Sequence, residues 1–151
     1  MKRFAFRLQP VLNLKNHQEN MAKMEVARVM QALFECEKKI EVLKKDLNSA
    51  LRDFDARTQI GIRAEELTFF TNYLTRIDRL VAHEENRERL IRKQLEEKQR
   101  LLKEKIIEKK TLETLKEKKK EAYYQEVEKM IQKESDDMTA IRRKEELPDG
   151  D

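Results

Sequence analysis

Apolar positions in the first third of the chain recur at steps that alternate between four and three residues. This spacing is typical of a heptad repeat whose a and d positions face a partner helix. Charged residues at two of the positions weaken the pattern near its start. It predicts a helix over about residues 10–57. The positions, which we call the first seam, are Leu8, Leu12, Lys15, Glu19, Ala22, Val26, Val29, Leu33, Cys36, Ile40, Leu43, Leu47, Ala50 and Phe54.

A second and more polar seam follows, and it predicts a helix over about residues 65–143. Charged residues at seam positions destabilise a coiled coil, so we expect the middle of the hairpin to pack more loosely than the part beside the turn. The second seam consists of Leu67, Phe70, Leu74, Ile77, Val81, Glu84, Glu88, Ile91, Leu95, Lys98, Leu102, Ile106 and Leu112.

The apolar phase lapses between the two seams, and this lapse predicts a turn at about residues 58–65. It contains Gly61, the only glycine between Pro10 and Pro148, and glycine tolerates the positive φ of a helix C-cap. A continuous helix through Gly61 is the alternative, because one glycine costs only about 1 kcal/mol. We expect a reversal, with Arg57 opposite Glu65.

Together these patterns predict an all-α fold, a two-helix antiparallel coiled-coil hairpin with a longer, overhanging second helix. We expect one domain over residues 1–151, a flexible tail at 144–151 and a monomeric chain. The helices would span roughly 70 Å and roughly 115 Å, so the second extends past the first from about residue 115. This overhang carries an apolar stripe that needs a partner. The stripe consists of Tyr123, Val127, Met130, Ile131, Met138 and Ile141.

Composition limits the alternatives to this elongated fold. Charged residues make up 42% of the chain and aromatic residues 6%, too few large apolar side chains for a globular core. The net charge of only +4 argues against a nucleic-acid binder. No stretch is apolar enough to cross a bilayer or to act as a signal peptide, and a single cysteine indicates a reducing compartment. We therefore expect a cytoplasmic protein.

Residues capable of catalysis or metal binding are isolated. His17 and His83 lack partners at ligand spacing, and Cys36 falls on the first seam, where a small buried residue is expected. We expect no enzyme activity, cofactor or metal. The stretch from Lys98 to Lys120 holds ten basic and four acidic residues. A solvated basic face is the plain interpretation, and a docking surface for an acidic protein or for anionic lipid is the alternative.

The chain starts with the pattern F-x-FRLQPVL, with Phe4 and then Phe6 to Leu12. This start and the far end of the chain resemble the FliJ family, the small soluble component of the bacterial flagellar export apparatus, and the resemblance extends over nearly the whole chain. The family often has Asp-Glu where this chain has Asp136-Asp137. Further matching residues are Gln18, Glu19, Ala22, Glu25, Leu112, Glu113, Leu115, Tyr123, Glu126 and the segment 133–142.

This resemblance implies an antiparallel coiled coil similar to the central stalk of rotary ATPases. Family members bind the hexameric export ATPase of the FliI type, contact the export-gate membrane protein FlhA and interact with export chaperones. The location implied is cytoplasmic, peripherally associated with the inner face of the cell membrane at the flagellar base. The alternatives are a stalk of virulence-type secretion or of a rotary ATPase, neither with the FRLQPVL start, and a plain structural or homodimerising coiled coil.

Two contact surfaces are expected. The resemblance implies that an export-gate contact lies shortly after the turn, where Tyr73 and Leu80 lie beside the seam while Phe70 and Ile77 also fit seam positions. The expected gate residues are Phe70, Tyr73, Ile77, Leu80 and Glu84. The end that bears both termini is expected to contact the ATPase ring, through Phe4, Phe6, Arg7, Leu8, Gln9, Tyr123, Val127, Met130 and Ile131.

Overall fold

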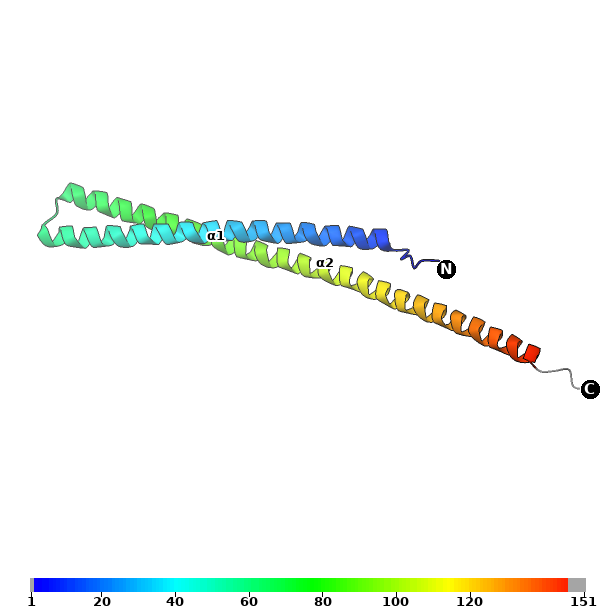
Figure 1. Ribbon diagram of the computed structural model, residues 1–151. Helices are drawn as coiled ribbons and strands as arrows, with labels where there is room; N and C mark the ends of the chain where they lie inside the picture. Colours follow the sequence, from blue (N-terminus) through cyan, green and yellow to red (C-terminus); the bar gives the residue numbers. More distant parts are fainter. Residues whose placement is uncertain (1, 147–151) are drawn as a thin grey trace, which may run out of the picture. The chain divides into compact units, whose positions relative to one another are not determined.

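Two helices joined by a short connection account for almost all of residues 2–146, the part of the chain that the computed structural model describes. Helix α1 spans Gln9–Ile60 and helix α2 spans Ala64–Glu146, and the described range contains no strand (Figure 1). Each helix begins one residue before its expected start and ends three residues after its expected end. Residues 144–146, expected in a flexible tail, belong to α2 instead, and 147–151 lie outside the described residues. The all-α prediction is confirmed.

The reversal occurs at Gly61, which has a φ of 108°. The Gly61 N–H donates a hydrogen bond to the Arg57 carbonyl at 3.1 Å and so closes the last turn of α1. Helix α2 begins with Glu65 and Glu66 in its first turn, where negative charge is favoured by the helix dipole. The continuous-helix alternative is therefore wrong.

Ion pairs between α1 and α2 fix the antiparallel register. Arg57 pairs with Glu66, Lys39 with Glu84 and Glu25 with Lys98, and in each pair the two residue numbers add up to 123. The pair Lys15–Glu108, nearer the start of α1, has the same sum. The expected register, with Arg57 opposite Glu65, is correct to within one residue.

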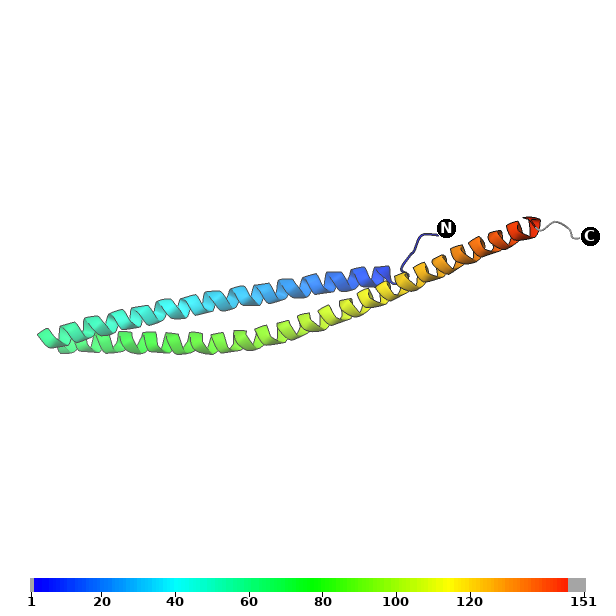
Figure 2. The same cartoon turned by 60° about the horizontal axis from the view of Figure 1, so that its bottom comes forward.

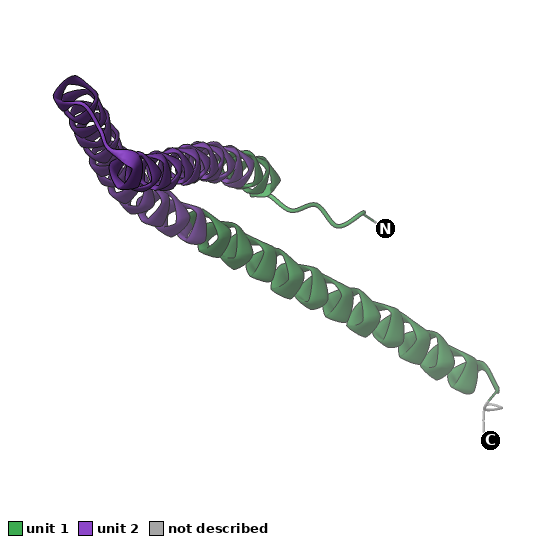
Figure 3. Cartoon of the chain, turned by 90° about the vertical axis from the view of Figure 1, so that its left-hand side faces the viewer, with its two compact units in different colours: residues 1–18, 105–151 green, residues 19–104 purple. Residues whose placement is uncertain are grey.

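The contacts divide the chain into two compact units (Figure 3). Unit 2 is residues 19–104 and contains the turn. Unit 1 combines residues up to 18 with residues from 105 onward, of which 2–18 and 105–146 are described. Each unit therefore pairs a stretch of α1 with a stretch of α2.

Unit 2 holds the best-packed apolar cluster. Val29, Cys36 and Ile40 of α1 are buried together with Ile91 of α2, and Leu33 and Leu95 pack against them. This cluster lies in the middle of the seam, whereas Phe70 near the turn is half-buried. The expectation of a looser middle is therefore wrong. Its charged position, Glu84, is accommodated by an ion pair rather than left unpaired.

Unit 1 is more polar along its seam. Half-buried positions on α2 continue as Lys105, Lys109, Leu112 and Lys116, whereas Ile106, expected on the seam, is exposed. The correction follows from spacing: steps of three and four from Leu102 reach Lys105 and Lys109, and Ile106 lies one residue out of phase. Beyond Tyr124 only Val127 is half-buried among the described residues, and all the others are exposed. The predicted overhang is confirmed (Figure 2).

Candidate contact surfaces

A polar cluster is buried between the helices of unit 2. The Glu84 carboxylate accepts a hydrogen bond from the Lys39 ammonium at 2.9 Å, and its other oxygen lies 3.7 Å from the Cys36 sulfur. The hydrogen bond from Lys39 lowers the pKa of the Glu84 carboxyl, and burial raises the pKa of the Cys36 thiol. Glu84 therefore stays charged at neutral pH while Cys36 stays a protonated thiol. A buried, protonated thiol is a poor nucleophile, which agrees with the expected packing role of Cys36.

The expected gate residues separate into buried and accessible groups. Ile77 and Glu84 are 5% and 4% exposed and face α1, so they serve the contact between the helices. Phe70 is half-buried and packs edge-on against Phe54, with ring centroids 5.7 Å apart. Tyr73 and Leu80 are 41% and 42% exposed and lie one heptad apart on the same flank of α2. Only these last two combine an apolar side chain with an accessible face.

Phe69 belongs to the accessible surface but was not expected there. It is 67% exposed and stacks on Tyr73, with the two rings 6.5 Å apart and nearly parallel. A depression beside the stacked rings is lined by Asp46 and Asp53 of α1, which gives the aromatic cluster an acidic rim. The seam pattern did not predict Phe69 as a surface residue, because Phe69 lies outside the heptad positions. The available signal was the concentration of three of the nine aromatic residues within residues 69–73.

Residues 2–8, the lead-in to α1, contact α2 in unit 1. The Phe4 ring packs against Tyr123 at 5.7 Å between centroids, and the Tyr123 hydroxyl donates a hydrogen bond to the Lys2 carbonyl. Phe6 is buried, and its carbonyl accepts a hydrogen bond from the Gln9 N–H, the first residue of α1. Pro10 follows in the first turn, where its missing N–H leaves no intrahelical bond unmade.

Gln9 also links the start of α1 to α2. Its side-chain oxygen accepts a hydrogen bond from the Lys116 ammonium at 2.8 Å. Leu8 is half-buried, whereas Arg7 is exposed. The structure therefore places Phe4, Phe6, Leu8 and Gln9 of the expected ring residues in contact regions within unit 1.

The rest of the expected ring surface lies on the overhang. Val127 is half-buried, but Met130 and Ile131 are 64% and 50% exposed. Farther along, Met138 and Ile141 are exposed as well. Apolar side chains that follow one another along a single helix without cover are typical of a protein contact surface.

A metal site and a membrane-spanning helix are both absent from residues 2–146. No group of three or more His, Cys, Asp or Glu side chains there is arranged to hold a metal ion. Neither helix has a stretch that is both long and apolar enough to span a membrane.

The fold and its surfaces define a two-helix antiparallel coiled coil that presents an apolar contact surface in each unit. A family model described as "Flagellar FliJ protein" matches residues 4–146. The chain belongs to the flagellar FliJ protein family, which makes it a component of flagellar, type III protein export.

A solved structure with the same fold is that of CT670 from Chlamydia trachomatis, described as a YscO homologue. It shares 18% sequence identity with this chain at a TM-score of 0.50, and the alignment covers 94% of this chain and 96% of that one. At this level of identity the likeness concerns the fold. No relative was found among curated proteins.

Proposed function

We propose that the chain is a non-catalytic coupling component of flagellar export, which links the hexameric export ATPase to the export-gate protein FlhA. It would act in the cytoplasm, at the inner face of the membrane beneath the flagellum, and also meet export chaperones. The observation that carries the proposal is the apolar stripe of the overhang, in which Phe4 packs on Tyr123, Val127 is half-buried, and Met130, Ile131, Met138 and Ile141 are exposed. A surface of this kind is stabilised when a partner removes it from water.

The ring surface, as proposed, consists of Phe4, Leu8 and Gln9 with Tyr123, Val127, Met130 and Ile131. Its two halves come from opposite ends of the sequence, and the Phe4–Tyr123 contact joins them. The exposed Lys119 and Lys120 of the same helix add positive charge. A partner with apolar pockets and acidic rims complements such a surface, as the lining of an ATPase ring can provide.

The gate surface, as proposed, consists of Phe69, Tyr73 and Leu80 on unit 2. Stacked aromatic side chains lose little conformational entropy on binding and bury large areas, so they often dominate the free energy of an interface. Phe70 supports this surface from below through its contacts with Phe54 and Phe69.

The ring contact is tested with the cognate export ATPase. Deletion of residues 1–9, or Tyr123→Ala with Met130→Ala, should weaken binding at least tenfold, equivalent to about 1.4 kcal/mol, and abolish stimulation of ATP hydrolysis. Helicity measured by circular dichroism should change little. The matched control is Met24→Ala with Met30→Ala, two exposed side chains of unit 2. Binding and stimulation that survive both changes would show that the ring holds the protein elsewhere.

The gate contact is tested separately with the soluble domain of FlhA. Tyr73→Ala with Leu80→Ala should reduce affinity at least tenfold, while Leu90→Ala, at a more exposed apolar site on unit 2, should leave it unchanged. Wild-type affinity in the double variant would remove the gate assignment. Sedimentation equilibrium of the free protein checks the predicted monomer, and a mass of two chains would favour the homodimerising alternative.

A further inference from the structure

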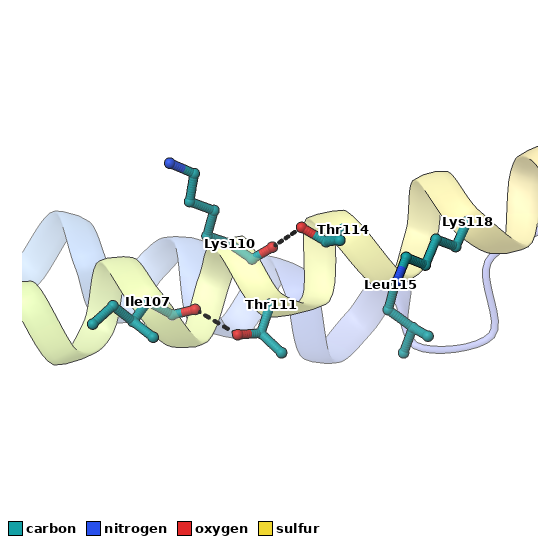
Figure 4. Close-up of a pocket in the computed structure, with 6 residues that line it drawn as sticks. All are labelled: Ile107, Lys110, Thr111, Thr114, Leu115 and Lys118. Atoms are coloured by element: carbon teal, nitrogen blue, oxygen red, sulfur yellow. Dashed lines mark hydrogen bonds between the residues drawn. The ribbon is translucent and has the colours of Figure 1, made fainter.

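Helix α2 carries another accessible apolar surface in unit 1, on the side away from α1. The half-buried residues Lys105, Lys109, Leu112 and Lys116 mark the side that faces α1. On the opposite, outward-facing side of the same stretch of α2 lies a shallow groove. It is lined by Ile107, Lys110, Thr111, Thr114, Leu115 and Lys118 (Figure 4). None of these residues belongs to the ring surface or the gate surface.

The groove is more apolar than its sequence suggests. The Thr111 hydroxyl donates a hydrogen bond to the Ile107 carbonyl, and the Thr114 hydroxyl donates one to the Lys110 carbonyl, both at 2.8 Å (Figure 4). Each threonine thus satisfies its donor within the helix and offers mainly its methyl group to the surroundings. With Ile107 58% exposed and Leu115 36% exposed, the groove presents four aliphatic groups to solvent.

The groove has the form that accepts another helix. Its lining residues fall into two rows at spacings of four: Ile107, Thr111 and Leu115 form one, and Lys110, Thr114 and Lys118 form the other. Rows of this spacing are the ridges of a helix surface, and the groove between two such ridges receives a ridge of a second helix in the commonest class of helix packing.

The charge of the groove has one sign. Lys110 and Lys118 are its only charged residues, no carboxylate lines it, and both ammonium groups are exposed. They lie eight residues apart, about 12 Å along the axis, with Thr111, Thr114 and Leu115 between them and Ile107 one turn before Lys110. A partner that fills the groove therefore needs apolar side chains together with negative charge near each lysine.

We propose that this groove is a docking site for an acidic amphipathic helix of a partner protein. Apolar side chains of the partner, spaced three or four residues apart, pack between the two ridges, and its flanking carboxylates pair with Lys110 and Lys118. Helix-in-groove recognition uses this combination of apolar anchors and charged flanks. The proposal goes beyond coupling of the ATPase to the gate, because it adds a partner at a surface that neither contact uses.

The probes are two fluorescein-labelled helical peptides of equal length, stapled to hold their helicity. Both carry leucines at spacings of three and four; one has glutamates on the flanks of the leucine face, and the other has lysines at the same places. Fluorescence anisotropy with the full-length protein should show the acidic peptide binding at least tenfold more tightly than the basic peptide. Its affinity should fall as salt is raised, because exposed charge pairs are screened.

Variants of the protein locate the site. Ile107→Ser with Leu115→Ser should weaken acidic-peptide binding at least tenfold, and Lys110→Glu with Lys118→Glu should reverse the preference so that the basic peptide binds more tightly. The matched control, Met138→Ser with Ile141→Ser, removes two exposed apolar side chains of the same helix and should change affinity less than twofold. Circular dichroism confirms that every variant keeps its helicity.

Several results would overturn the proposal. They are equal binding of both peptides, no binding of the acidic peptide, or an equal loss in the Met138→Ser, Ile141→Ser control. Vesicles containing phosphatidylserine provide a further test. If the wild-type protein binds these vesicles and the Lys110→Glu, Lys118→Glu variant does not, while the variant binds the acidic peptide as tightly as the wild type does, the two lysines contact a lipid surface and the helix-docking proposal is wrong. None of these outcomes depends on the ATPase or FlhA experiments.

Discussion

The two units of this chain use the same two helices in different ways. Unit 2 buries seven apolar residues between its helices, among them Val29, Ile40 and Ile91. The described part of unit 1 buries only Phe6 and Leu12, and much of its seam is made of half-buried lysines. A lysine stem can cover apolar surface while its ammonium group remains in water, but it contributes less than a leucine or isoleucine in the same place.

This difference indicates which unit supplies most of the stability of the hairpin. Burial of apolar area is the dominant favourable contribution to folding, so unit 2 should provide most of the stability of the hairpin. In unit 1 the apolar side chains lie largely outside the seam, on the overhang and in the groove at Ile107 and Leu115. Local stability there should depend on what binds to these surfaces.

The most severe test of this contrast compares matched core truncations in the two units. Ile40→Ala removes a side chain that is 7% exposed, and it should destabilise the protein by about 2 to 4 kcal/mol. Leu112→Ala removes a half-buried side chain from unit 1 and should cause less than half that change. Urea unfolding followed by circular dichroism measures both. Equal shifts of the two midpoints would show that the units contribute equally.

Glu84 provides the next test, because it is a buried charged group on the unit 2 seam. Glu84→Gln keeps the volume and removes the charge, and it should destabilise the protein by about 1 to 3 kcal/mol, because a charge-assisted hydrogen bond with Lys39 is lost. The control is Glu41→Gln, whose ion pair with Lys45 is solvent-exposed and should contribute little. Equal stability of the Glu84 variant and the wild type would mean that the buried pair only fixes register.

The same variant makes a prediction about pH. The pKa of the Glu84 carboxyl is lowered in the folded protein, chiefly by the hydrogen bond from Lys39, so the unfolded state binds this proton more tightly. The resulting stabilisation is present above the ordinary carboxyl pKa of 4.5 and is lost as pH falls through the lower folded value. The difference in unfolding free energy between wild type and Glu84→Gln should therefore shrink as the solution is made acidic.

Spacing alone sufficed for most of the fold. All fourteen positions of the first seam are buried or half-buried, and the reversal at Gly61 and the register were both predictable. Two errors arose where residue type was given more weight than spacing, whereas Leu67, which is in phase on the second seam, is 42% exposed beside the turn. Ile106 was placed on the seam because it is apolar, and the middle of the hairpin was expected to be loose because Glu84 is charged. Because the register places Lys39 opposite Glu84, the ion pair that stabilises the charge of Glu84 could also have been predicted from the sequence.

The surfaces were less predictable than the seam. Heptad positions do not show which flanking side chains will be covered, so Ile77 and Glu84 were grouped with the accessible Tyr73 and Leu80. Whether Thr111 and Thr114 turn their hydroxyls toward the backbone depends on side-chain rotamers, which no sequence pattern reports. The groove beside Ile107 became visible only with these side chains in place.

A smaller effect is expected at the turn. Gly61 has a φ of 108°, a conformation that side-chain-bearing residues rarely adopt, while the space that an added Cβ would occupy is open. Gly61→Ala should therefore destabilise unit 2 by about 1 kcal/mol through backbone strain alone, without a steric clash. Gly61→Asn should be milder, because asparagine tolerates positive φ better than alanine. Thermal unfolding distinguishes the two, and identical melting temperatures for alanine and glycine would contradict the strain argument.

The smallest global effect should come from the lead-in of unit 1. Phe4→Ala removes the ring that packs on Tyr123, yet Phe4 is only half-buried and the main core lies in unit 2. The free energy of global unfolding should change by less than about 0.5 kcal/mol.

Local opening should respond more strongly than global stability. With the ring gone, the backbone amides of the first turns of α1, from Val11 onward, should exchange with solvent several times faster, while amides around Ile40 and Ile91 keep their protection. Hydrogen exchange read by mass spectrometry separates the two regions in one experiment, and Arg7→Ala, which removes an exposed side chain of the same segment, is the control. If Phe4→Ala accelerated exchange equally in both units, the lead-in would be stabilising the whole hairpin, and unit 1 would not open separately from unit 2 as its sparse core predicts.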